Sequence, residues 1–120
     1  MAGLTQARQQ AILDAEFVSG DYFMFSANGT SEATTVPRIP VGSWTGATAA
    51  SPSSKGNTGA LVGGAIITSP TTISHWAVIS AATGGTQKTD WHPVNGGTPK
   101  AYAVGEQPTV AAGAFTVTLD

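Results

Sequence analysis

The sequence of 120 residues contains no cysteine, so neither a disulfide framework nor a thiolate metal site is available to it. Its stability must therefore come from packing or from assembly. No stretch approaches the roughly 20 apolar residues of a membrane span, and no membrane partner is expected. The first residues, MAGLTQARQQ, lack the basic-then-apolar order of a signal peptide. This predicts a protein that folds in the cytoplasm where it is made.

Charge is scarce as well. Charged residues make up 10% of the chain, against about 25% in an ordinary soluble domain. The five basic residues are scattered and the net charge is −2, so no basic patch marks a nucleic-acid partner. A free monomer usually keeps itself soluble with a coat of mixed charges. A surface of Thr, Ser, Ala and Gly favours extensive contacts with other proteins; the alternative is a neutral, hydroxyl-rich surface like that of many secreted β proteins.

The length fits a single domain, residues 1–120. It opens with apolar residues at three- and four-residue steps, which predict an amphipathic helix over residues 4–18. The stripe consists of Leu4, Ala7, Ala11, Ala15 and Val18, with Leu13 and Phe17 as a second pair. Ser19-Gly20 is expected to end the helix, because Gly accepts a left-handed backbone. So short a helix is marginal alone and must dock on something, which makes Leu4 and Ala11 candidate contact residues.

From residue 21 to 120 short alternating runs, separated by Gly, Pro and Asn, predict β-structure. Asn28-Gly29 is a strong hairpin signal, so residues 21–27 are expected to pair with 30–36. Residues 71–82 carry apolar groups on both faces and predict a central strand. Residues 46–60 are small and polar and predict a long surface loop. Roughly six to eight short strands after one N-terminal α-helix predict a mainly β fold, an antiparallel β-sandwich or a small barrel.

Catalytic chemistry has few candidates here. The chain has two histidines, and either His75 or His92 could pair with Asp90 as a base. No nucleophile motif accompanies them, so we interpret them as satisfied or half-exposed polar groups. Asp90 and His92 would share one strand face but supply only two metal ligands. The sequence therefore predicts no enzyme, no catalytic residue, no metal and no cofactor.

The aromatic residues allow two interpretations. They would form a stacking platform for sugars or bases, or they would fill the core, which is their commoner use. Trp44 and Trp91 stand next to loop-like segments and are the exceptions that we expect at the surface. Together with His92, Leu4 and Ala11 they form the predicted contact or binding surface.

The C-terminal half also carries a resemblance. The runs ISHWAVISAATGGTQ (73–87) and AYAVGEQPTVAAGAFTVTLD (101–120) resemble small bacteriophage virion proteins described as tail fibre or minor tail proteins. The opening MAGLTQARQQAILDAEF is similar as well. The likeness covers about the first 20 residues and residues 71–120, whereas residues 21–59 depart from the family's pattern. It implies a virion component without catalysis.

The leading hypothesis is thus a tail-associated virion structural protein that assembles with itself, with a trimer as the expected state, and with other virion proteins. Sparse charge and a helix of small residues permit close approach between subunits. A capsid decoration protein on the head surface is a variant of this hypothesis. A receptor- or glycan-binding module at the tail tip, with Trp44, Trp91 and the 46–60 segment as its binding face, is the alternative from another class.

Overall fold

The N-terminal helix is present and shorter than predicted. The computed structural model describes residues 4–50, 52–66, 69–94 and 97–119, and α1 spans Gln6–Glu16. Thr5 caps its N-terminus, with Oγ1 accepting from the Arg8 amide at 3.3 Å. The chain leaves the helix at Phe17, which is already extended. Gly20 is therefore not the helix stop; Asp21 shapes the exit, because its Oδ2 accepts from the Val18 amide at 3.0 Å.

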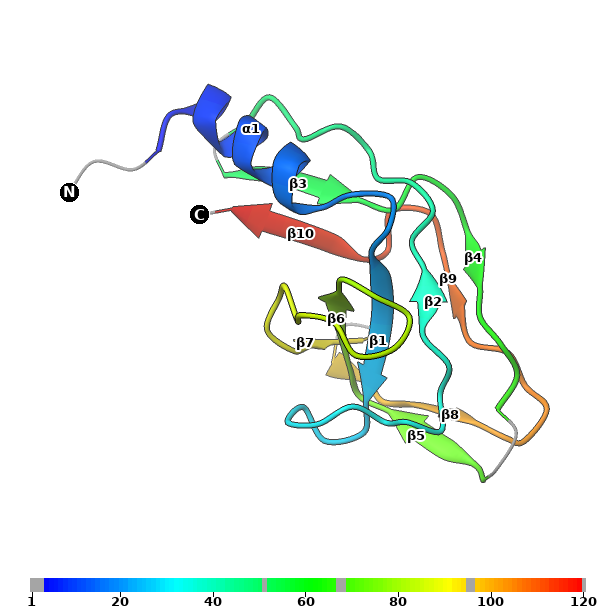
Figure 1. The fold of residues 1–120 in the computed structure, drawn as a ribbon. Coiled ribbons are helices and arrows are strands. Elements are labelled where there is room, and N and C mark those ends of the chain that lie inside the picture. The colour runs from blue at the N-terminus through cyan, green and yellow to red at the C-terminus, as the bar shows by residue number, and fades with distance from the viewer. Residues whose placement is uncertain (1–3, 51, 67–68, 95–96, 120) are drawn as a thin grey trace.

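Ten short strands follow α1 in the described part of the chain. They are β1 (Tyr22–Ser26), β2 (Ile39–Pro40), β3 (Ser53–Gly56), β4 (Leu61–Val62), β5 (Thr71–Ile73), β6 (His75–Ile79), β7 (His92–Pro93), β8 (Lys100–Tyr102), β9 (Thr109–Val110) and β10 (Thr116–Leu119). All their pairings are antiparallel. The predicted class, mainly β and antiparallel with one N-terminal α-helix, is confirmed (Figure 1).

One four-stranded sheet, ordered β2-β1-β6-β7, forms the centre of the molecule. The prediction of a central strand in residues 71–82 is confirmed for residues 75–79 alone, since β6 lies between β1 and β7. Both outer strands are two residues long and end in proline, at Pro40 and Pro93. Proline has no N–H to donate to a further strand, so these edges resist additional pairing.

Residues 71–82 contribute one strand to each of two sheets. The segment divides at Ser74, whose amide bonds the Ser26 carbonyl at 2.8 Å and whose carbonyl accepts from the Val94 amide at 2.9 Å. Before this point β5 pairs with β8, and after it β6 pairs with β1. Two further ribbons, β4 with β9 and β3 with β10, complete the sheets. In Figure 1 the β3–β10 ribbon lies beside α1 at one end of the molecule and β5–β8 lies at the other.

The predicted hairpin at Asn28-Gly29 is wrong. The position beside β1 is taken by β6 and β2 instead, and no strand is formed by residues 30–36. The chain does turn here, because Asn28 Oδ1 accepts from the amides of Thr30 at 2.9 Å and Ser31 at 3.1 Å. This Asx arrangement closes a local turn without a partner strand. The strand His75–Ile79, apolar from Trp76 onward, offers β1 more burial than the polar 30–36 segment.

The predicted long surface loop at 46–60 is also wrong in its second half. β3 lies within it and pairs along its whole length with β10. Ser53, Lys55 and Asn57 are all buried. The Asn57 side chain donates to the carbonyls of Gly59 at 2.8 Å and Ala111 at 2.9 Å. A polar sequence is buried here because each of these side chains has a hydrogen-bond partner.

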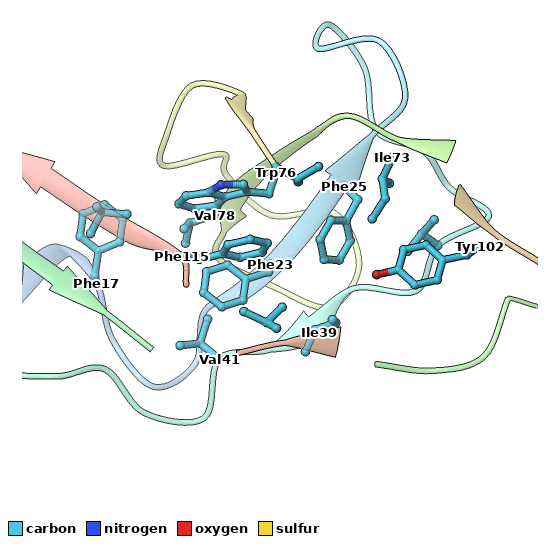
Figure 2. Packing of buried hydrophobic residues seen from close by; sticks show 14 of the residues in the cluster. Phe17, Phe23, Phe25, Ile39, Val41, Ile73, Trp76, Val78, Tyr102 and Phe115 are labelled. Atoms are coloured by element: carbon cyan, nitrogen blue, oxygen red, sulfur yellow. The ribbon is translucent and has the colours of Figure 1, made fainter. Parts of the chain in front are cut away.

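The main core lies on one face of the four-stranded sheet (Figure 2). Phe23 is fully buried at its centre, with edge-on ring contacts to Trp44, Trp76 and Phe115 at 5.0–5.7 Å between centroids. Trp76 and Phe115 stack face to face at 4.5 Å. The aromatics thus provide the bulk that this chain, poor in large aliphatic residues, needs to fill its interior.

The opposite face of the same sheet carries a smaller cluster. Strand alternation points Met24, Ala77 and Ile79 away from the main core. Tyr22 and Trp91 pack over them. Both faces of the β1–β6 pair are therefore covered, as the apolar pattern of residues 71–82 predicts.

Candidate functional site

The stripe of apolar helix residues does not pack within its own subunit. The side of α1 that faces the β-structure is formed by Gln9 and Leu13, followed by Phe17 at the helix end. Gln9 Oε1 accepts from the Ser53 amide at 2.8 Å, so a polar residue anchors the helix on β3. Docking through Gln9 leaves the opposite side of the helix to solvent.

We call that solvent-facing side the outer helix face. It consists of Ala7, Ala11 and Ala15 on α1, together with Leu4 just before the helix and Val18 just after it, and all five are exposed. Leu4 is 46% and Val18 45% exposed, and Ile12 beside them is 39% exposed. Only two other large apolar side chains in the described part of the chain are comparably exposed. Exposed apolar residues on and beside one short helix form a surface suited to a protein contact.

Two lysines donate hydrogen bonds to carbonyls at the C-terminal end of α1. Lys55 Nζ donates to the Phe17 carbonyl at 3.2 Å and pairs with Asp14 at 2.9 Å. Lys88 Nζ donates to the Glu16 carbonyl. A cation at this end neutralises the partial negative charge of the helix carbonyls. The hydrogen bond from Lys55, assisted by the Ala47 amide, lowers the pKa of the Asp14 carboxyl.

Another ion pair holds the segment between β6 and β7. The Arg38 guanidinium makes two bonds to Glu32, at 2.7 and 2.9 Å. It also donates to the carbonyls of Ala81 and Gly84 at 2.8 Å each. The hydrogen bond to Glu32 raises the pKa of Arg38 above its already high ordinary value, so this turn is held by a permanent cation.

Trp44 is half-buried and engaged with its own subunit. Its indole N–H donates to the Val18 carbonyl at 3.0 Å. Its ring meets Phe17 and Phe23 edge-on at 5.6 Å each. The structure thus brings Trp44 to the end of α1, next to the outer helix face. Its ring is part of the core packing there.

Trp91 and His92 lie elsewhere. Trp91 is half-buried over the second cluster, against Met24, Ala77 and Ile79. His92 is exposed and stacks on Trp76 at 5.6 Å between ring centroids. It also lines a groove of about 480 Å³, where Ile12 and Glu16 of α1 face Lys88 and β10. Of the predicted contact residues, His92, Leu4 and Ala11 are exposed, and Trp44 and Trp91 are partly covered.

The two histidines lie in different surroundings. His75 Nδ1 is 2.7 Å from Ser74 Oγ, and its ring lies against the turn at Gly29. No ion pair or hydrogen bond joins Asp90 to either histidine in the described ranges. Across those same ranges no three His, Cys, Asp or Glu side chains gather in a group able to hold a metal ion.

Comparison with protein-family models gives no match to this chain, and comparison with curated proteins gives none either. Within residues 4–50, 52–66, 69–94 and 97–119, no helix has the length and apolar character to cross a membrane.

The internal role of Lys55 and Lys88 was not apparent from the sequence. Both stand in polar, glycine-containing segments that are typical of loops. The only signal in the sequence was the small number of basic residues. With five in the chain, a lysine is expected to pair with a specific group.

Proposed function

We propose that this chain is a non-enzymatic structural protein of a bacteriophage virion. It is associated with the tail, as a tail fibre or minor tail protein, and it acts by assembling with copies of itself and with neighbouring virion proteins. A trimer is the expected state. The resemblance of residues 73–87 and 101–120 to virion proteins of this kind supplies the biological setting.

The observation that carries the proposal is where the few charges are placed. Three of the five basic side chains, Arg38, Lys55 and Lys88, form ion pairs with carboxylates of the same chain. All three also donate to backbone carbonyls. These charges hold the fold together and add little to the surface. The rest of the surface is largely neutral, and a neutral surface costs less free energy to desolvate when another protein covers it.

The outer helix face supplies a place for such a contact. Its central residues, Ala7, Ala11 and Ala15, are small enough for a second element to approach the helix backbone closely. Leu4 and Val18 stand at its two ends with nearly half of their surface exposed. Burial of these apolar side chains gives a favourable free energy of association.

A sugar-binding surface built on Trp44 gains no comparable support. The ring of Trp44 packs on Phe17 and Phe23, and its N–H already donates to a carbonyl of its own chain. A stacking platform needs an uncovered aromatic face. We therefore favour assembly over glycan binding.

Purified phage particles provide the test. Mass spectrometry of washed particles should find the chain at a fixed copy number per particle, and gold-labelled antibody should mark the tail. Gold on the head would replace the tail assignment with the capsid-decoration variant. Absence of the chain from washed particles would refute the virion proposal.

A further inference from the structure

A cavity of about 380 Å³ lies where the four-stranded sheet meets the β5–β8 and β4–β9 ribbons. Apolar side chains form part of its lining: Phe25 from β1, Ile73 from β5, Val110 from β9, and Phe115 just before β10. Each of these side chains is less than 10% exposed. The volume falls within the range of about 300–1,000 Å³ that small-molecule sites occupy. Core residues thus line a space large enough for a ring or a short aliphatic chain.

Two polar groups of β8 line this cavity. Residues 100 and 102 share one side of the strand, because side chains alternate along it. Tyr102 is only 6% exposed, yet its hydroxyl makes no hydrogen bond within the described part of the chain. In Figure 2 the hydroxyl oxygen of Tyr102 points inward, toward Phe25. This hydroxyl oxygen is still reached by solvent, since no fully buried polar side-chain atom of the described residues lacks a hydrogen-bond partner, so it is free to donate to a bound molecule.

Lys100 is the charged group at this site. It is exposed, and its Nζ lies 5.8 Å from the centroid of the Tyr102 ring. The described lining holds no acidic side chain. Arg38, Lys55 and Lys88 are paired with carboxylates of their own chain, whereas Lys100 forms no such pair in the described ranges. The cavity therefore combines several aromatic and aliphatic side chains with one hydroxyl donor and one exposed cation.

From this arrangement we infer that the cavity binds a small hydrophobic carboxylate, an aromatic or aliphatic body that carries one anionic group. The body fills the space between Phe25, Ile73 and Phe115. The carboxylate accepts a hydrogen bond from the Tyr102 hydroxyl and lies within the field of Lys100. The inference goes beyond the proposed virion function and rests on none of the contacts that assembly would use.

NMR titration of the full chain tests this site. Hydrocinnamate is the probe, with phenylpropylamine as a cationic analogue of similar size and acetate as a carboxylate without the apolar body. Hydrocinnamate should bind saturably with a Kd on the order of 1 mM. Its amide shift changes should centre on residues that line the cavity. The amine and acetate should bind at least tenfold more weakly.

Variants identify the groups responsible. Tyr102→Phe removes only the hydroxyl, so its thermal stability should be unchanged and its affinity for hydrocinnamate about tenfold lower. Lys100→Gln should weaken binding severalfold. Arg8→Gln removes the other unpaired cation, which lies on α1, and should change nothing. Equal affinity for acid and amine, unchanged binding by Tyr102→Phe, or no saturable binding of hydrocinnamate would overturn the inference.

Discussion

Lys88 and Asp21 form an ion pair with 2.9 Å between Nζ and Oδ1, and the Asp21 side chain is 1% exposed. The pair links the exit of α1 to the segment between β6 and β7. Both residues also bond to the end of the helix: Lys88 donates to the Glu16 carbonyl, and Asp21 accepts from the Val18 amide. A chain with so few charges has thus placed one pair in its interior.

Removal of one partner leaves the other charge buried without compensation. Lys88→Met should lower the free energy of unfolding by about 3–5 kcal/mol. Urea denaturation followed by tryptophan fluorescence measures the change. Lys100→Met is the matched control, because Lys100 is exposed, and it should shift stability by less than about 0.5 kcal/mol. Equal effects of the two substitutions would show that the buried ion pair adds no more to the unfolding free energy than an exposed lysine does.

The ion pair of Asp14 with Lys55 makes stability depend on pH. The pKa of Asp14 is lowered in the folded chain, first by the hydrogen bond from Lys55. A carboxyl of this kind stabilises the fold above its unfolded pKa of about 3.9 and loses that effect as pH falls through the folded pKa. Wild type should therefore exceed Asp14→Asn in unfolding free energy at pH 7. The difference should shrink below about pH 4; a difference constant down to pH 2 would contradict the assignment.

The aromatic core predicts a large penalty for truncation. Phe23 is fully buried and contacts three other aromatic rings. Phe23→Ala should cost about 3–5 kcal/mol in unfolding free energy, since it leaves a cavity as well as losing apolar burial. Val62→Ala, at a residue that is 62% exposed, should cost less than about 0.5 kcal/mol. Chemical denaturation of both variants decides whether the Phe23 cluster is the core that the structure shows.

Local pattern was sufficient for some features of this fold. The helix in the first residues, the β character of the rest and the central position of residues 75–79 all follow from periodicity and composition. These signals are local, since they depend on which face of an element is apolar. The same alternation is seen at β10, where Val117 is buried and Thr116 and Thr118 are exposed.

Pairing between distant segments could not be predicted in the same way. The Asn28-Gly29 signal identifies a turn, but it says nothing about β6, which lies some fifty residues away and competes for β1. Lys55 and Asn57 are buried because acids, carbonyls and amides from other elements meet them. Likewise, the direction in which α1 docks depends on contacts with distant segments, among them the hydrogen bond from the Ser53 amide to Gln9. The cavity beside Tyr102 exists only once three sheets converge.

Sedimentation velocity of the purified chain over a wide concentration range tests the central claim most directly. Wild type should sediment as an oligomer. Ala11→Arg, in the middle of the outer helix face, should sediment as a monomer that keeps the circular dichroism spectrum of the wild type, because arginine is a good helix former. Ala82→Arg, at an exposed site in the turn after β6, should assemble like wild type. A wild-type chain that stays monomeric at every concentration would contradict self-assembly as its mode of action.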